Sequence, residues 1–337
     1  MSERHTFGEG ALEFFAADVP SSEDAAALMN LEPRNPFCTK VYAEALGRCG
    51  QRPWLLGTKR NGKLVSGCYG FTTSFLLDRV LRIDSLSRVA ADKIFWDGLM
   101  QFCSEQRVTY LSLQNCASRA RIPCLPGDVK RSNLFEYVLD LADAGWERKV
   151  APHHWRNIKR SRQIVVTLRR TTRCQEHGRL IVVSNERRRK LGEKIIGSFE
   201  PDLRESALFL EKGVAELFQA VAGGKVLSSV LVLRASKGAY YYTAGNSPEA
   251  LRLGASHFLV HAIARILHEE LIPEFNFGEV PPGTGTSLFF LRFGATAVPR
   301  EDATLDLASP LRRKLQDITH AFLQAGPALL RQIRGRA

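Results

Sequence analysis

The sequence lacks several patterns that would assign it to a protein class at once. No two of its seven cysteines form a C-x-x-C pair, and their number is odd, so neither a structural zinc site nor a disulfide framework is expected. No run of about 18 apolar residues is present, which excludes a transmembrane helix. The N-terminus has no basic segment followed by an apolar core, so we expect no signal peptide. A G-x-S-x-G motif and a Ser-His-Asp or Cys-His pattern are also missing, which leaves covalent catalysis without support.

Acidic residues are too few to balance the basic ones. The chain has 47 Lys and Arg residues against 35 Asp and Glu, for a net charge of +12. Such an excess favours an anionic partner, namely a nucleic acid, a nucleotide-like cofactor or an anionic membrane surface. A basic surface without a specific partner is the alternative. Because the cysteine pattern suits a reducing compartment, we expect a cytoplasmic protein.

An internal repeat is the clearest feature that is present. "NGKLVSGCYGF" (61–71) and "GGKVLSSVLVL" (223–233) each combine a tight turn with a β-rich strand, and each predicts a hairpin. In both copies an amphipathic helix and then a short alternating strand follow. These helices are predicted over 93–106 and 257–270, and the strands over 108–114 and 274–280.

The repeat is too long for a solenoid unit and indicates a duplicated domain. Each copy combines a hairpin, a third strand, helices and a last strand, so we predict an α+β fold, a mixed sheet flanked by helices. We place one domain at 1–130, a second at 131–305, and a basic amphipathic helix at 306–337.

The two copies differ between the third strand and the following helix. Only the second has Gly245 and a basic, Gly-containing stretch there, which we interpret as a loop. Glycine lets a backbone approach a ligand closely, and the N–H groups at a helix N-terminus bind anions. We therefore predict the donor's phosphate site at Arg252, Gly254, Ala255, Ser256 and His257, and expect the first copy to be non-catalytic.

This stretch resembles the loop of the GNAT acyltransferase core, Arg/Gln-x-x-Gly-x-Gly/Ala, although the spacing from Arg252 to Gly254 is one residue shorter. Four segments together are similar to the FemAB-like family, which has two tandem GNAT-fold domains. They are "NPFCTKVYAEAL", "FEYVLDLADAGWERKVAPHHWRNIKRSRQ", "YYYTAGNSPEALRLGASHFL" and "FNFGEVPPGTGTSLFFLRFGA".

The resemblance implies transfer of an acyl or aminoacyl group to an amine, in a cell-envelope precursor or a small molecule. The donor would be an aminoacyl-tRNA or an acyl-CoA, acting as co-substrate, with no tightly bound cofactor. The chain departs from the family at Glu279, where Arg is frequent, and at Phe290, where Lys is common. The loss of that Lys favours acetyl- or acyl-CoA as donor, and Arg292 is the nearest base.

Residues 148–173 hold nine Arg and Lys residues and no acidic one. Arg156, Lys159 and Arg160 share a helical face, and Asn157 belongs to the Arg-Asn-Ile-Lys core of the resemblance. We predict that these four residues contact a phosphate-rich ligand: a tRNA end, CoA or a lipid-linked pyrophosphate. A solvated charged helix is the alternative.

Acyl transfer to an amine requires a group that accepts or carries the amine's proton. The candidates are Glu279, Tyr240 and Tyr242; the two tyrosines share one face of a strand, whereas Tyr241 lies on the other. The loop over 278–287 contains Gly283 and Gly285, and we predict that it contacts substrate together with Arg292. A plain turn before the last helix is the alternative.

Two further features, three histidines and the C-terminal helix, lie outside the site predicted above. His257, His261 and His268 lie on one predicted helix, but H-E-x-x-H and a third ligand are missing, so no metal site is expected. The C-terminal helix either packs on the first domain or touches the inner face of an anionic membrane. A non-catalytic nucleic-acid-binding or membrane-binding protein is the remaining functional alternative.

Overall fold

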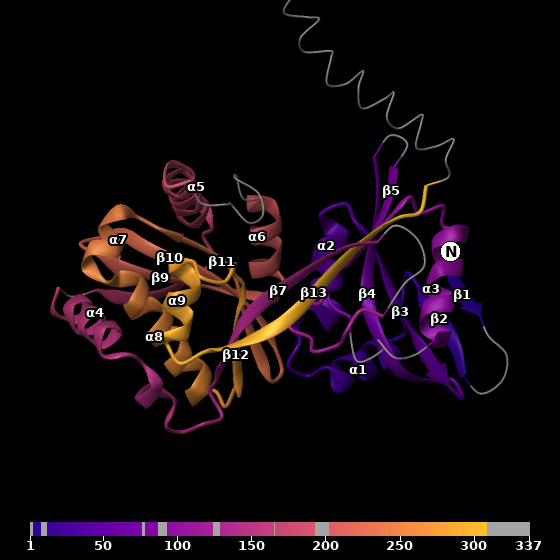
Figure 1. The fold of residues 1–337 in the computed structure, drawn as a ribbon, viewed down its shortest axis with the longest axis horizontal. Helices are drawn as coiled ribbons and strands as arrows, with labels where there is room; N and C mark the ends of the chain where they lie inside the picture. Colours follow the sequence, from indigo (N-terminus) through magenta and orange to yellow (C-terminus); the bar gives the residue numbers. More distant parts are fainter. Residues whose placement is uncertain are drawn as a thin grey trace, which may run out of the picture.

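The structure is a computed structural model that describes residues 3–7, 12–75, 78–86, 93–123, 129–164, 166–192 and 202–308. One 13-stranded sheet runs through these residues in the order β1-β2-β3-β4-β5-β6-β13-β7-β12-β11-β10-β9-β8. Helices cover both faces of the sheet in two lobes that lie side by side (Figure 1). The predicted α+β class is confirmed, while the predicted C-terminal helix falls outside the described residues.

The first half is built on the predicted hairpin. Its turn residues Asn61 and Gly62 have φ values of 50° and 77°, as a two-residue type I′ turn requires. Its strands are β1 (Arg4–Phe7), β2 (Leu12–Ala17), β3 (Arg52–Arg60), β4 (Lys63–Phe75), β5 (Asp78–Ile83) and β6 (Tyr110–Leu113). Its helices are α1 (Ser22–Leu31), the 3₁₀ turn η1 (Pro36–Cys38), α2 (Lys40–Arg48) and α3 (Lys93–Glu105).

The second half repeats the central part of this order: two helices, a hairpin, a third strand, a helix and a further strand. Gly223 and Gly224, with φ values of 53° and 76°, form the turn of its hairpin. Its strands are β7 (Val129–Asp140), β8 (Thr167–Thr171), β9 (Ala215–Ala222), β10 (Lys225–Ala235), β11 (Gly238–Asn246), β12 (Glu274–Glu279) and β13 (Thr296–Asp306). Its helices are η3 (Trp146–Lys149), α4 (Pro152–Gln163), α5 (Gln175–Lys190), α6 (Leu203–Glu211), α7 (Pro248–Leu253), α8 (Ala255–Glu269) and α9 (Gly285–Leu291).

The predicted loop before α8 is wrong in part, because six of its residues form α7. The side chain of Ser247 caps this helix by accepting from the Ala250 N–H, and Pro248 occupies its first turn. Gly254, at φ 73°, ends α7 and begins α8. These are ordinary start and stop signals of a helix, so the sequence did carry this element.

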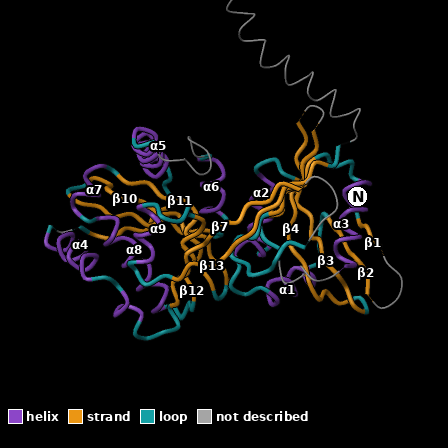
Figure 2. The backbone as a smooth tube through the Cα atoms, in the orientation of Figure 1, coloured by secondary structure: helices purple, strands orange, loops and turns teal. Residues whose placement is uncertain are grey.

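The last strand of each half lies in the middle of the sheet, where the halves meet. β13 pairs with β6 of the first half and with β7, and β7 pairs in turn with β12. Figures 1 and 2 show β7 and β13 crossing from one lobe to the other. An apolar core at the junction contains side chains from both halves, including Phe37, Tyr42, Phe209 and Tyr240.

Candidate active site

The neighbouring parallel strands β11 and β12 part within the second half. Their ladder covers only two pairs, Ala239 with Phe275 and Tyr240 with Asn276, although β11 continues to Asn246. In the first half the corresponding strands β5 and β6 pair over four positions. Parted strands leave main-chain groups at a sheet edge, where an extended ligand or a carbonyl oxygen can bind.

The tyrosines of β11 alternate as predicted. Tyr240 and Tyr242 lie on the side of the junction core, whereas Tyr241 packs against the core of the second half. The Tyr240 hydroxyl donates to Glu136 Oε1 at 3.0 Å. Burial and the neighbouring Glu136 carboxylate raise the pKa of Tyr240 well above its usual range, so this phenol stays protonated and acts as a hydrogen-bond donor.

Glu136 on β7 is the centre of this polar group, with 3% of its surface exposed. Besides Tyr240, it accepts from Asn276 Nδ2 at 2.7 Å and from the Ala117 N–H at 3.0 Å. Burial raises the pKa of Glu136, and the hydrogen bond from Asn276 and the charge of Arg300 partly offset this shift. The result is a buried, fully hydrogen-bonded carboxyl beside the parted strands.

Arg300 on β13 connects Glu136 to Glu279, one of the three predicted proton carriers. Its guanidinium lies 3.1 Å from Glu279 Oε2, 2.8 Å from Asp302 Oδ2 and 3.8 Å from Glu136 Oε1. Burial opposes the charge of Arg300, but the acidic groups around it raise its pKa overall. Glu279 therefore belongs to an ion-pair network and shares its cation with two other carboxylates.

The Asn-Pro-Phe segment of the first half forms one wall of this site. The ring of Phe37 packs edge-on against Tyr240, with centroids 5.0 Å apart. The Asn35 amide donates to Ser85 Oγ at 2.6 Å and to the Ala117 carbonyl oxygen at 3.3 Å. The Ala117 N–H donates to Glu136. A main-chain group of the first half therefore helps to hold the buried Glu136 carboxyl of the second half in place.

Tyr242 belongs to a second polar group next to the first one. Its hydroxyl donates to Glu205 Oε1 at 2.8 Å, and burial raises the pKa of Glu205. From the first half, the Tyr42 hydroxyl donates to Asp84 Oδ2 at 2.8 Å, and Asp84 pairs with Arg82 at 2.8 Å. Like Tyr240, Tyr242 has a raised pKa, mainly because it is buried.

Gly254 and Gly245 were predicted to lie close to a ligand. In the structure they lie close to helices. At Gly254, which has a φ of 73°, a Cβ would lie 2.6 Å from the Asn157 carbonyl oxygen of α4. At Gly245, a Cβ would overlap the backbone of α5 at Ile181. Ala255 and Ser256 are buried at the start of α8, whereas Arg252 is exposed.

The basic helix α4 lies across the α7–α8 junction. Arg160 donates to the Arg252 carbonyl oxygen at 3.0 Å, and Ser161 Oγ donates to the Leu253 carbonyl oxygen at 2.7 Å. These bonds satisfy carbonyls at the C-terminus of α7. Arg156 and Lys159 are exposed, so these two side chains can meet a ligand from solvent.

The predicted substrate loop lies beside α9. Gly283 and Gly285 are both exposed, and Gly285 begins the helix behind its cap Thr284. Arg292 is exposed at the other end of α9, where its carbonyl accepts from the Ala151 N–H at 2.8 Å. Phe290 is 2% exposed and stacks on Phe277 with centroids 4.4 Å apart. A buried aromatic stack at position 290 explains why no lysine is found there.

The histidines of α8 do not act as one group. His261 Nε2 lies 2.9 Å from a Glu147 carboxylate oxygen, and His268 Nδ1 lies 2.8 Å from the Leu141 carbonyl oxygen. His257 instead faces His153 and His154 of α4. A sequence search for i, i+4 pairs on one helix misses this contact, because it joins two helices.

Three residues that sequence reasoning missed, Glu136, Asn276 and Arg300, hold the buried centre together. Asn276 and Glu136 lie within segments quoted for the family resemblance, but nothing in their local pattern marks them as polar partners. The two acidic residues that follow Arg300 in "PRED" are the one local signal for this residue.

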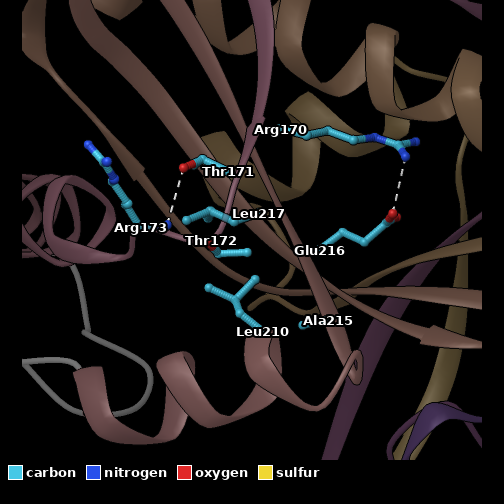
Figure 3. A pocket seen from close by; sticks show the side chains of 8 residues that line it. All are labelled: Arg170, Thr171, Thr172, Arg173, Leu210, Ala215, Glu216 and Leu217. Carbon is cyan, nitrogen blue, oxygen red and sulfur yellow. Dashed lines mark hydrogen bonds and ion pairs between the residues drawn. The ribbon is translucent and has the colours of Figure 1, made fainter.

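Two hollows open elsewhere on the second half, and neither is lined by a predicted site residue. The first, of about 460 Å³, lies at the end of edge strand β8, where an ion pair joins Arg170 to Glu216 at 3.2 Å (Figure 3). The second, of about 410 Å³, lies between η3, α4 and α8. Neither contains Tyr240 or Glu136, so the candidate centre rests on its polar contacts and on the parted strands.

Comparison with known protein families finds a match within the second half. Residues 148–285 match the family model of the acetyltransferase (GNAT) domain. This part of the chain is similar to a GNAT domain. Tyr240, Glu279 and the α7–α8 junction lie inside the matched segment. No curated protein sequence matches the chain.

Solved structures extend the GNAT likeness to both halves. FemX is 12% identical, with a TM-score of 0.63 over 86% of this chain and 96% of its own. A tandem GNAT protein from the clavulanic acid biosynthesis pathway is 14% identical, with a TM-score of 0.54 over 88% and 99%. L-PGS from Bacillus licheniformis is 12% identical, with a TM-score of 0.50 over 90% and 97%. The predicted fold of two tandem GNAT-like domains is confirmed.

Proposed function

We propose that this protein is an acyltransferase that moves an acyl or aminoacyl group from a phosphate-rich donor to an amine. The observation that carries the proposal is the parting of β11 and β12 directly beside the buried Glu136–Tyr240–Asn276 group. Tyr240 and Asn276 lie in the segment that matches the GNAT family model, and the end of the β11–β12 ladder lies beside a fixed proton-bearing hydroxyl.

In the proposed reaction the amine nitrogen attacks the donor's carbonyl carbon. The C–N bond forms, the C–O bond of an ester or the C–S bond of a thioester breaks, and the amine's proton ends on the leaving oxygen or sulfur. Main-chain N–H groups of β11 after Tyr240 would stabilise the negative oxygen of the intermediate. Tyr240, which stays protonated, would turn its hydrogen bond from Glu136 to the leaving group, while Glu136 and Glu279 carry the amine's proton to that group.

Aminoacyl-tRNA is the first candidate donor because of where the charge lies. Residues 148–192 contain 14 Lys and Arg residues and two Glu, a net charge of +12 that equals that of the whole chain. They form α4, edge strand β8 and α5, which lie on the two faces and the edge of one end of the sheet (Figure 1). A polyanion longer than CoA suits a basic surface of this extent.

Acyl-CoA is the second candidate donor. The matching family model is that of an acetyltransferase domain, and position 290 lacks the lysine common in the FemAB-like family. The acceptor would be an amine of a small molecule or an envelope precursor. Among the described residues, no helix is both long and apolar enough to cross a membrane; we propose a cytoplasmic location, with contact to the inner membrane face as the alternative.

The test offers acetyl-CoA and charged tRNA separately to the purified protein and follows thermal unfolding, then adds candidate amines and analyses the products by mass spectrometry. Stabilisation by one donor, together with a new amide product, is expected. Stabilisation by neither donor would contradict the proposal. Stabilisation by uncharged RNA of any sequence, without product, would favour the non-catalytic nucleic-acid-binding alternative.

A further inference from the structure

Three imidazoles from two helices meet where α4 crosses the start of α8. His153, His154 and His257 each offer a ring nitrogen, and the three nitrogens lie within 4.8 Å of one another. The rings of His153 and His154 have centroids 4.3 Å apart, and those of His154 and His257 are 4.5 Å apart. Nitrogen ligands at about 2.0–2.1 Å from a tetrahedral ion are about 3.3 Å apart, so small side-chain rotations suffice.

The tautomer of His154 is set by a backbone group. Its Nε2 lies 3.0 Å from the Phe289 carbonyl oxygen, which can only accept, so this nitrogen carries the proton. The other nitrogen, Nδ1, then presents a lone pair toward His153 Nε2, 2.9 Å away. Metal-binding histidines are oriented in this way, with one ring nitrogen donating to a carbonyl and the other facing the ion.

His257 has a buried ring nitrogen that this arrangement leaves without a partner. Among the described residues, its Nδ1 makes no hydrogen bond, and its Nε2 has only the Asn157 amide at 3.4 Å. Buried polar atoms without a partner are rare and unfavourable in folded proteins, and a bound ion would remove this one. Burial lowers the pKa of His154 to about 4 and that of His257 to about 3, so both rings are neutral at pH 7.

We propose that His153, His154 and His257 bind a divalent transition metal of the zinc type, with a fourth coordination position open to solvent. Imidazole nitrogens suit Zn²⁺, Co²⁺, Ni²⁺ and Cu²⁺, whereas Mg²⁺ and Ca²⁺ prefer oxygen ligands. The positive charges of Arg156, Arg160 and Arg292 act on these histidines. They favour an anion, such as hydroxide or phosphate, as the fourth ligand.

A metal site at these three histidines departs from the expectation of no metal site, and it does not depend on acyl transfer. The ion would join α4 to α8 next to Gly254, and so would fix the helix junction at which we predict the donor's phosphates. His261 and His268, which appeared with His257 in the sequence pattern, have no part in it.

The experiment uses the full-length protein, stripped with a chelator and dialysed. Co²⁺ is titrated while the visible absorption is recorded, and Zn²⁺ competes for the site in a second titration. The wild-type protein should bind one equivalent of Co²⁺ with a visible band and release it to Zn²⁺. His153→Gln and His257→Gln should each weaken binding at least about tenfold, while the matched control His268→Gln on α8 should bind as the wild type does.

Two outcomes would overturn the proposal: no visible band at any Co²⁺ concentration, or the same affinity in His153→Gln and His257→Gln as in the wild type. Circular dichroism of the stripped proteins checks that each variant is folded. His153 is only partly buried on α4, so His153→Gln decides the matter if His257→Gln does not fold.

Discussion

The two halves of this chain repeat one order of elements, yet they end their paired strands differently. In the first half, β5 and β6 pair over four positions, and an isolated bridge between Ser85 and Asn115 continues the contact. In the second half, β11 and β12 pair over two positions and then part beside Tyr240. The paired strands thus stay together in the first half and part in the second. The loops after β5 and β6 of the first half supply a wall to the site where the strands part. We therefore propose that duplication has produced one site and one support for it.

The halves also differ in charge. The segment that carries the whole net charge of +12, residues 148–192, belongs to the second half alone. The parted strands and the basic surface thus occur together, as a site for an anionic donor requires.

The largest expected effect concerns Gly254. In Gly254→Ala the Cβ meets Asn157 at a left-handed φ of 73°, so backbone strain and overlap should together lower the free energy of unfolding by about 3 kcal/mol. Gly62→Ala in the first-half hairpin is the matched control, since its φ is 77° and nothing lies within 4 Å. That variant should lose only about 1 kcal/mol. Urea denaturation measures both values, and equal losses would refute a role for the α4 contact.

The next effect separates the two faces of β11. Tyr240→Phe removes the hydroxyl that donates to Glu136, and turnover should fall roughly 100-fold, as for other groups that stabilise a transition state. Tyr241→Phe changes the neighbouring residue, which faces the core of the second half, and should leave turnover within about twofold. Steady-state rates with the donor identified by thermal protection decide the matter. A similar loss in both variants would indicate general damage to the strand.

A smaller effect tests the charge difference between the halves. Arg156→Ala with Lys159→Ala should lower the slope of log affinity against log salt for single-stranded RNA by up to about 1.4, or 0.7 for each lost contact. Arg60→Ala with Lys63→Ala removes two exposed basic side chains from the first half and should leave the slope unchanged. Fluorescence anisotropy at several salt concentrations measures both. Equal slopes in the two double variants would show that the binding is not localised to the second half.

The smallest effect is a pH dependence of stability. Burial lowers the pKa of His177 to about 4, whereas an unfolded histidine has a pKa near 6.5. Between these values the unfolded chain binds the proton, so stability from this neutral ring is present above about pH 6.5 and is lost as the pH falls toward 4. His177→Gln should reduce the slope of the unfolding free energy against pH in this window, by at most about 1.4 kcal/mol per pH unit. A slope like that of the wild type would show that His177 is not responsible.

Local patterns were enough to predict the hairpin, the following helix and the next strand of each half, because hairpin turns and helical periodicity are properties of neighbouring residues. The alternation of Tyr240, Tyr241 and Tyr242 also followed from strand geometry. The short helix α7 was missed although Ser247, Pro248 and Gly254 signal it, since a family pattern suggested a loop there.

The polar centre could not be predicted in the same way. Glu136 meets Tyr240 across 104 residues and Asn276 across 140, and such contacts depend on how β7 and β13 cross between the halves. The prediction that Gly254 allows a ligand to come close was incomplete for the same reason. The residue that lies against Gly254, Asn157, belongs to another helix, α4. Phe290 looked like a lost functional residue, and only its stack on Phe277 shows that it is part of the core.

The most direct test of the central claim is hydrogen–deuterium exchange with and without the stabilising donor. We expect slower exchange in peptides covering 238–279, where β11 and β12 part and α8 begins, and no change in peptides covering 78–86 and 93–113 of the first half. Protection of the first-half peptides alone, or of neither set despite donor binding, would contradict the claim that the open half holds the donor.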